Sequence, residues 1–138
     1  MFKVSRILPV ALLCAAQAFA NNKQIPSAVS ATFKKQYPSA TNVKWEEERG
    51  KYEVSFHQGK DKMSVLYSSS GVAEETETEI PTAALPAKAL TYASAKGKIK
   101  EAARIVLANG SIIYEAEVDH KDLLFDEKGT FKEERSEK

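Results

Sequence analysis

The sequence predicts an α+β domain in which a helix followed by four antiparallel strands occurs twice, with both helices packed on one face of the sheet. Segments of the first half return in order in the second half: 25–29 and 85–89, 52–54 and 114–116, 65–71 and 123–129. Their offsets are 60, 62 and 58 residues, so the loop lengths differ between the halves. Ordered self-similarity indicates an internal repeat, here with copies at about 24–80 and 84–135.

Each half is predicted to open with a helix. Pro26 and Pro86 suit the first helical turn, where a missing N–H costs nothing. Apolar residues then recur at helical spacing, at Val29, Phe33 and Tyr37 in the first half and at Ala89, Leu90, Tyr92 and Ala93 in the second. Pro38 and Gly97 are predicted to end the two helices.

Strands with two-residue alternation follow each helix. They are predicted at 43–46, 52–57, 63–67, 72–80, 99–107, 112–118 and 123–125, with a short charged strand through residue 134. Turns are expected at 58–61, 70–71, 109–110 and 128–129, and Asn109-Gly110 is the strongest hairpin signal. One strand face is apolar and the other polar, as in an antiparallel sheet covered by helices on one side.

An acidic run at 74–79 alternates glutamate with threonine. The alternation places Glu75, Glu77 and Glu79 on one face and Thr76 and Thr78 on the other. A site for a cation or a basic partner is one interpretation, although a calcium loop would need a glycine and a fixed ligand order. We expect an edge strand that is protected by its charge.

The first twenty residues predict a secretory signal peptide at 1–20. Lys3 and Arg6 precede an apolar run at 7–16, and Ala18-Phe19-Ala20 offers small residues for cleavage near Ala20. The run is too short to cross a bilayer, which takes about 20 residues. We therefore expect a periplasmic or secreted protein whose mature chain, 21–138, has no membrane span and forms one domain.

Composition excludes several kinds of chemistry. Cys14 is the single cysteine and lies within the predicted signal peptide, so disulfides and thiolate catalysis are not expected. Without Lys3 and Arg6 the 20 basic residues become 18 against 19 acidic ones, and a formal charge of −1 does not favour nucleic acid. Phosphate loops, dinucleotide fingerprints and a Gly-x-Ser-x-Gly elbow are absent from the sequence, so no cofactor and no enzymatic activity are expected.

Several short motifs of the first half occur in a fixed order: Ile-Pro at 25–26, Tyr-Pro-x-Ala at 37–40, Val-Lys-Trp at 43–45, Tyr-Glu-Val-x-Phe at 52–56, and Gly71 after a strand. Together they resemble the PepSY-like family of exported bacterial proteins, whose fold is likened to β-lactamase inhibitory proteins. The resemblance implies a tandem domain without catalytic residues, and binding through a concave sheet face and loop tips. The second half departs from the pattern, since it has neither tryptophan nor Tyr-Pro.

Candidate binding residues lie on the polar strand face. We expect an apolar patch on an otherwise charged surface, made of Leu66, Ile113 and Leu124 beside Glu53, Glu115 and Glu117. Such a face suits a protein partner, and the first hypothesis is a non-catalytic, inhibitor-like module toward an envelope or secreted enzyme. His57 and His120 are interpreted as solvated side chains, not as a metal pair.

The alternative is a sensor of small ligands or metal ions in the envelope. It would use Glu53, His57, Glu115 and Glu117 across neighbouring strands. The aromatic residues of the first half share the parity of the core valines and are predicted to pack in the core: Trp45, Tyr52, Phe56 and Tyr67.

Overall fold

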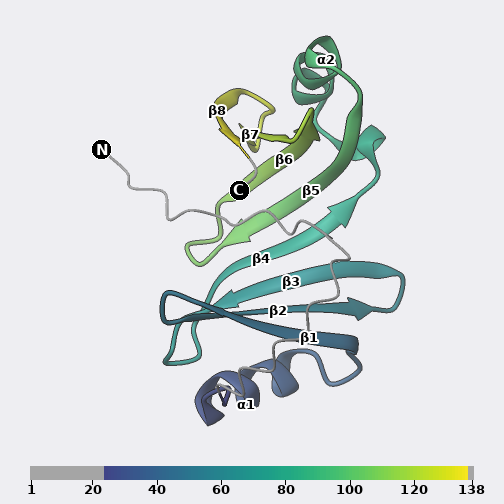
Figure 1. The fold of residues 1–138 in the computed structure, drawn as a ribbon. Helices are drawn as coiled ribbons and strands as arrows, with labels where there is room; N and C mark the ends of the chain where they lie inside the picture. Colours follow the sequence, from purple (N-terminus) through teal and green to yellow (C-terminus); the bar gives the residue numbers. More distant parts are fainter. Residues whose placement is uncertain (1–23, 137–138) are drawn as a thin grey trace.

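A computed structural model describes residues 24–136 of the protein. The predicted signal peptide, Cys14 and the cleavage site near Ala20 lie outside the described residues. Figure 1 shows a helix and four strands followed by a second helix and four strands. The first set is α1 (Ser27–Gln36), β1 (Thr41–Glu48), β2 (Lys51–Gln58), β3 (Asp61–Tyr67) and β4 (Ala73–Ile80). After a 3-10 turn (Thr82–Ala84) come α2 (Ala87–Lys96), β5 (Ile99–Leu107), β6 (Ile112–Val118), β7 (Lys121–Asp126) and β8 (Phe131–Ser136).

The eight strands form one sheet in the order β1 to β8, and every neighbouring pair is antiparallel. This arrangement confirms the α+β class that the alternating patterns predicted. Neither helix within 24–136 has the length and apolar character needed to cross a membrane.

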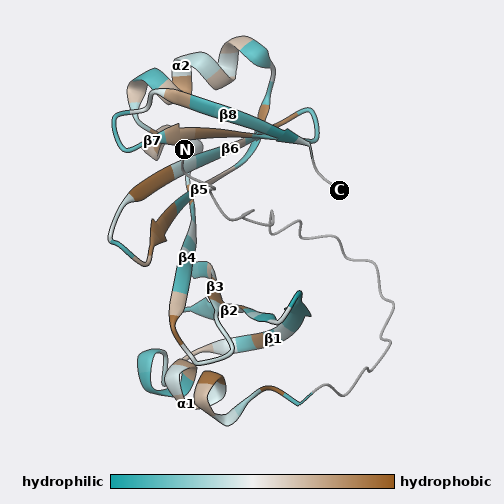
Figure 2. Ribbon diagram, turned by 90° about the vertical axis from the view of Figure 1, so that its left-hand side faces the viewer, coloured by the Kyte–Doolittle hydropathy of each residue, from teal (hydrophilic) through white to brown (hydrophobic). Residues whose placement is uncertain are grey.

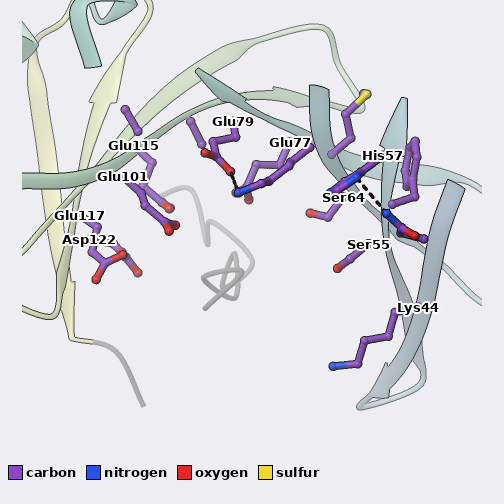
Figure 3. Close-up of a pocket in the computed structure, with 16 residues that line it drawn as sticks. Lys44, Ser55, His57, Ser64, Glu77, Glu79, Glu101, Glu115, Glu117 and Asp122 are labelled. Atoms are coloured by element: carbon purple, nitrogen blue, oxygen red, sulfur yellow. Dashed lines mark hydrogen bonds and ion pairs between the residues drawn. The ribbon is translucent and has the colours of Figure 1, made fainter. Parts of the chain in front are cut away.

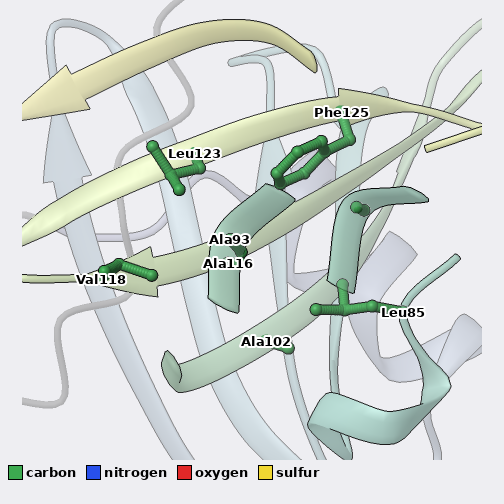
Figure 4. Close-up of a cluster of buried hydrophobic side chains, with 8 residues drawn as sticks. Leu85, Ala93, Ala102, Ala116, Val118, Leu123 and Phe125 are labelled. Carbon is green, nitrogen blue, oxygen red and sulfur yellow. The ribbon is translucent and has the colours of Figure 1, made fainter. Parts of the chain in front are cut away.

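Both helices cover the same face of the sheet, and each covers its own half (Figure 1). Strand pairing places Val65 opposite Thr76, and Ile80 of the same strand opposite Ala102, so Val65 and Ala102 share one face. Below α1 lies the first-half core: Val29, Phe33, Val54, Phe56, Val65 and Tyr67. Below α2 lies the second-half core: Leu85, Ala89, Ala93, Ala102, Ala116, Val118, Leu123 and Phe125 (Figure 4).

The two cores are built from different side chains. Phe33 packs edge-on against Trp45 and Phe56, with ring centroids 5.3 and 5.0 Å apart. In the second half the helix contributes alanines, and the rings come mainly from the strands, where Phe125 and Phe131 lie 6.0 Å apart. The predicted packing of the first-half aromatic residues in the core is confirmed, since Trp45 and Tyr52 pack against its buried members.

The acidic strand is not at an edge, and that expectation was wrong. β4 lies at the centre of the sheet between β3 and β5, whereas β1 and β8 form the two edges. The predicted parity is correct: Glu75 and Glu77 pair with Leu66 and Ser64 on one face, and Thr76 pairs with Val65 on the other. The glutamates of this strand therefore protect no edge. They lie in the middle of the sheet, on the face away from the helices.

Three hairpin turns close in the same way. In each, one backbone N–H donates to a carbonyl four residues on, and the glycine N–H donates back to the first residue of the turn. These turns are Ser68–Val72, Leu107–Ser111 and Asp126–Thr130, with Gly71, Gly110 and Gly129 at φ of 85°, 84° and 83°. A positive φ at this position explains why glycine occurs in each of these three turns.

Candidate functional site

The face of the sheet away from the helices is polar, and we call it the polar face. Figure 2 shows the sheet bending so that this face lies on the inside of the curve, with α1 and α2 outside. Strand pairing runs one row of its residues across the sheet: Ser55, Ser64, Glu77, Ile105 and Ile113. The next row runs through Ala103, Glu115, Leu124 and Glu133. Both halves of the chain therefore contribute to one continuous surface.

A groove of about 240 Å³ lies on this face. β1, β2 and β3 contribute Lys44, Ser55, His57, Lys62 and Ser64 to one side. β5, β6 and β7 contribute Glu101, Glu115, Glu117 and Asp122 to the other side, and Glu77 and Glu79 of β4 lie between them (Figure 3). The groove is therefore basic and hydroxylic toward the first half and acidic toward the second.

All six predicted binding residues lie on the polar face, but the structure does not gather them at one spot. Glu115 and Glu117 line the groove. Glu53 and Leu66 pair with each other beside it, and Ile113 extends the row of Glu77. Leu124 is 2% exposed between Glu115 and Glu133, so it supports the groove wall and offers little surface of its own.

Carboxylates of the polar face have pKa values well above the ordinary 4.5. Burial, followed by repulsion from Glu46 and Glu75, raises the pKa of Glu53 to about 7, and burial also raises the pKa of Glu75 to about 7. Burial and the neighbouring Asp122 raise the pKa of Glu115 to about 8. Burial and Glu115 raise the pKa of Glu77 as well. Desolvation disfavours the charged form of each group, and mutual repulsion adds to that effect.

Strand pairing gives the local cause of this desolvation. Glu115 lies directly between Ala103 and Leu124, which are both buried. Glu77 lies between Ser64 and Ile105, which are buried as well. Buried neighbours on adjacent strands, which are apolar except for Ser64, displace the water that a carboxylate needs to stay ionised.

Two lysines neutralise part of the groove. Lys62 lies 3.3 Å from Glu79, and Lys100 donates a 2.9 Å hydrogen bond to Glu117. Within residues 24–136, no hydrogen bond or ion pair joins the carboxylates of Glu77 or Glu115 to another side chain. The centre of the acidic side therefore contains two carboxyl groups, of Glu77 and Glu115, that no side-chain ion pair in the described part of the chain neutralises.

The two histidines lie apart. His57 lines the groove and is within hydrogen-bonding distance of Asn42, 3.1 Å away, whereas His120 lies in the β6–β7 turn at a φ of 59°. The alternative hypothesis placed Glu53 and His57 on strands next to Glu115 and Glu117, and this was wrong, because β3, β4 and β5 separate β2 from β6. Among the described residues, no three His, Cys, Asp or Glu side chains are grouped so as to hold a metal ion.

Sequence reasoning missed four acidic lining residues: Glu77, Glu79, Glu101 and Asp122. For Glu77 and Glu79 the signal was present, since their strand parity was predicted but the strand was expected at an edge. For Glu101 and Asp122 the signal lies only in the pairing of β5, β6 and β7, which places both opposite Glu117.

A protein-family comparison accounts for nearly all of the described chain. The family described as "Putative beta-lactamase-inhibitor-like, PepSY-like" matches residues 13–73 and again residues 50–133. The chain belongs to this PepSY-like family. Membership confirms the resemblance carried by the Tyr-Pro and Val-Lys-Trp motifs, and it favours a non-catalytic binding protein over an enzyme.

Solved structures share the fold of this PepSY-like protein. A BLIP-like protein from Bacteroides fragilis is 26% identical, with a TM-score of 0.61 over 80% of this chain and 85% of its own. One of the "putative periplasmic proteins" of Bacteroides eggerthii is 16% identical, with a TM-score of 0.69 over 81% of this chain and 88% of its own. Among curated proteins, none matches the chain.

Proposed function

We propose that this PepSY-like protein is an exported, non-catalytic module that binds an envelope or secreted protein, in the manner of an inhibitor, through its polar face. The observation that carries this proposal is the groove, to which seven of the eight strands contribute. A surface built on paired strands positions its contact residues more precisely than one built on loops, which suits specific recognition of a partner. The likeness to a BLIP-like protein and the family's inhibitor-like description support the same proposal.

Leu66 and Ile113 are the apolar contacts that we assign to this surface. Both are half-buried on the polar face, where Leu66 lies between Glu53 and Glu75, and Ile113 lies between Ile105 and Asp126. Apolar side chains that remain partly open among polar ones are the usual anchors of a protein interface, with a polar rim around them. Glu53 lies opposite Leu66 and belongs to that rim.

The two halves are, in our proposal, copies of one ancestral unit, at about 24–80 and 84–135. The order of elements is the same in both halves. In addition, the turn glycines Gly71 and Gly129 have the same φ and each lies against the first turn of the helix in its own half. Such correspondence extends beyond the short sequence matches and supports a duplication within one domain.

Affinity capture tests the binding proposal. Tagged mature protein is incubated with an envelope extract, and the retained proteins are identified and titrated to saturation. We expect one saturable partner whose retention falls at least about tenfold in Leu66→Lys and in Ile113→Lys, because a charge is placed where an apolar contact is buried. Val72→Lys is the matched control, since Val72 is 55% exposed in the Ser68–Val72 turn, away from the groove.

Equal retention by all three variants and the parent protein would contradict the assignment of the polar face. Export is tested separately, by fractionating cells and sequencing the N-terminus of the envelope form. We expect a periplasmic or secreted chain that begins at Asn21, and an intact Met1 in the cytoplasm would contradict export.

A second candidate function is binding of a small molecule, which the concave shape and volume of the groove favour. Thermal-shift screening of envelope metabolites discriminates it from the first. A saturable rise in Tm that is lost in Ser64→Leu would support it, because the buried Ser64 hydroxyl lines the groove.

A further inference from the structure

The acidic side of the groove contains a carboxylate that lacks a partner. Glu115 is 8% exposed, lines the groove, and makes no hydrogen bond or ion pair with another side chain within residues 24–136. Figure 3 shows its side chain among those of Glu101 and Glu117. Its carboxylate oxygens are not among the fully buried side-chain atoms without a partner in residues 24–136, so they are open to the groove and a ligand of complementary charge can reach them.

The groups around Glu115 are mostly acidic. On β4 these are Glu75, Glu77 and Glu79; on β5, Glu101; on β6, Glu117; on β7, Asp122; and on β8, Glu133 and Arg135. The cations nearby already have partners: Arg135 pairs with Glu133, Lys100 with Glu117, and Lys62 with Glu79. Burial and these acidic neighbours disfavour ionisation of Glu115 more than Arg135 favours it, and a cation from outside the chain would favour its ionised form.

We propose that this acidic side of the groove receives a lysine or arginine side chain from an extended basic segment of the partner protein, held between Glu115 and Glu77. This inference rests on the proposed function and names the chemistry of the partner. The backbones of these two residues lie two strands apart, about 10 Å across the sheet, and Glu115 is two residues along β6 from Ile113, which is in register with Glu77. The charge of Glu115 is nevertheless the largest charge effect on the pKa of Glu77. Their side chains can thus approach one cation from two sides, and a guanidinium or ammonium can donate to both.

An organic cation fits this place better than a metal ion. Within residues 24–136 the acidic side chains are not grouped as a metal site, and Glu77 and Glu115 form no ion pair with a basic side chain. The groove is also long enough to take an extended side chain, since it continues past Glu77 to Ser64 and Ser55 of the first half. A basic segment would therefore place its charged end at Glu115 and its backbone along the serines.

Binding of such a cation is linked to pH. The pKa of Glu115, raised to about 8, means that the free protein holds a proton there at neutral pH. A cation binds the ionised carboxylate, so binding releases that proton. Affinity should therefore increase as the pH rises from 6 toward 8.5.

The test uses mature protein and short capped peptides as probes, followed by NMR of backbone amides. The probes are acetyl-Ser-Arg-Ser-amide, the same peptide with lysine, and the same peptide with norleucine, which matches lysine in shape without its charge. We expect the two basic peptides to shift amides of β4, β5 and β6 saturably at pH 8, more tightly than at pH 6, and norleucine to bind at least tenfold more weakly, a difference of about 1.4 kcal/mol.

Glu115→Gln is expected to weaken the basic peptides about tenfold, because it removes the charge and keeps the shape. Glu127→Gln is the matched control, since it changes the net charge equally in an exposed turn residue that does not line the groove. Equal weakening by both variants would overturn the proposal, since general attraction alone would then explain binding. Equal binding of the norleucine peptide would overturn it too.

Two further outcomes separate this inference from the proposed function. If none of the three peptides binds while envelope capture still yields a partner lost in Leu66→Lys, the cation site is overturned and the binding function stands. Spermidine serves as a free polyamine: if it binds more tightly than the basic peptides and loses affinity in Glu115→Gln, the ligand is a polyamine and the assignment to a protein segment is overturned.

Discussion

The hydroxyl of Tyr67 donates a hydrogen bond of 2.6 Å to the side-chain oxygen of Gln36. The bond joins the last residue of β3 to the last residue of α1. Tyr67 is fully buried in the first-half core, and burial raises its pKa to about 12. α1 is thus held to the sheet at its C-terminal end by a polar contact, in addition to the packing of Val29 and Phe33.

Tyr67→Phe removes this contact while leaving the ring in place. We expect a loss of about 1 kcal/mol in the free energy of unfolding, as for a typical hydrogen bond, because the exposed Gln36 can turn to water. Urea denaturation of Tyr67→Phe, Gln36→Ala and the double variant measures it. If the two single losses simply add in the double variant, the hydrogen bond does not contribute as described.

Gly71→Ala should destabilise the protein by more than the backbone cost of placing alanine at a positive φ. An added Cβ at Gly71 would lie 2.7 Å from the carbonyl oxygen of Ala28, so the turn and α1 must separate. Gly110 has nearly the same φ but open space around it. Gly110→Ala therefore measures the backbone cost alone, which is roughly 1 kcal/mol. We expect Gly71→Ala to cost about 2 kcal/mol more than Gly110→Ala in chemical denaturation, and equal losses would contradict the close packing.

Stability should fall as the pH rises from 5 to 8. The folded protein holds protons on Glu115, Glu53 and Glu75, whose pKa values are about 8, 7 and 7, whereas the unfolded chain releases them near 4.5. The native state therefore binds more protons in this window, and the free energy of unfolding decreases with pH. We expect Tm to drop by roughly 10 °C between pH 5 and pH 8. A Tm that is constant or rises across this range would refute the burial of these carboxyls.

Glu115→Gln should stabilise the protein at pH 8 and leave it nearly unchanged at pH 5. The amide resembles the protonated carboxyl that the folded state prefers, so the variant avoids the cost of keeping a proton at high pH. We expect a gain of about 1–3 kcal/mol at pH 8, reduced from the full pKa shift because the neighbouring acids titrate together. Glu127→Gln, in an exposed turn, should change stability by less than about 0.5 kcal/mol at either pH.

Local pattern was enough to predict most elements of the fold. The apolar spacing of Val29 and Phe33 predicted α1, and the strand predicted at 99–107 coincides with β5. Position within the sheet was harder to predict, because it depends on which strands pair between the halves. β4 has polar residues on both faces and so appeared to be an edge strand, yet its glutamates face Leu66 and Ile105 of its two neighbours.

The sequence predicted which face of the sheet carries the candidate site, but not where on that face its residues gather. Parity alone assigned Glu53, Leu66 and Glu115 to one side of the sheet, and strand pairing agrees. Curvature then decided which of these residues line the groove, and it brought His57 and Glu117 to its opposite sides from strands far apart in the sheet. Bending of a sheet arises from twist and bulges distributed over many strands, so no short motif encodes it.

The two helices each cover one half, and the strands of the two halves meet in the sheet at the ladder between β4 and β5, where Ile80 of β4 also packs against the second-half core. The buried residues of the two cores form separate clusters, so a small change of angle along this ladder leaves the packing within each cluster in place. We therefore expect the protein to be mechanically compliant about β4, with a groove that narrows or widens while both halves stay rigid. Such compliance would let one polar face bind partners whose contacting segments differ somewhat in width.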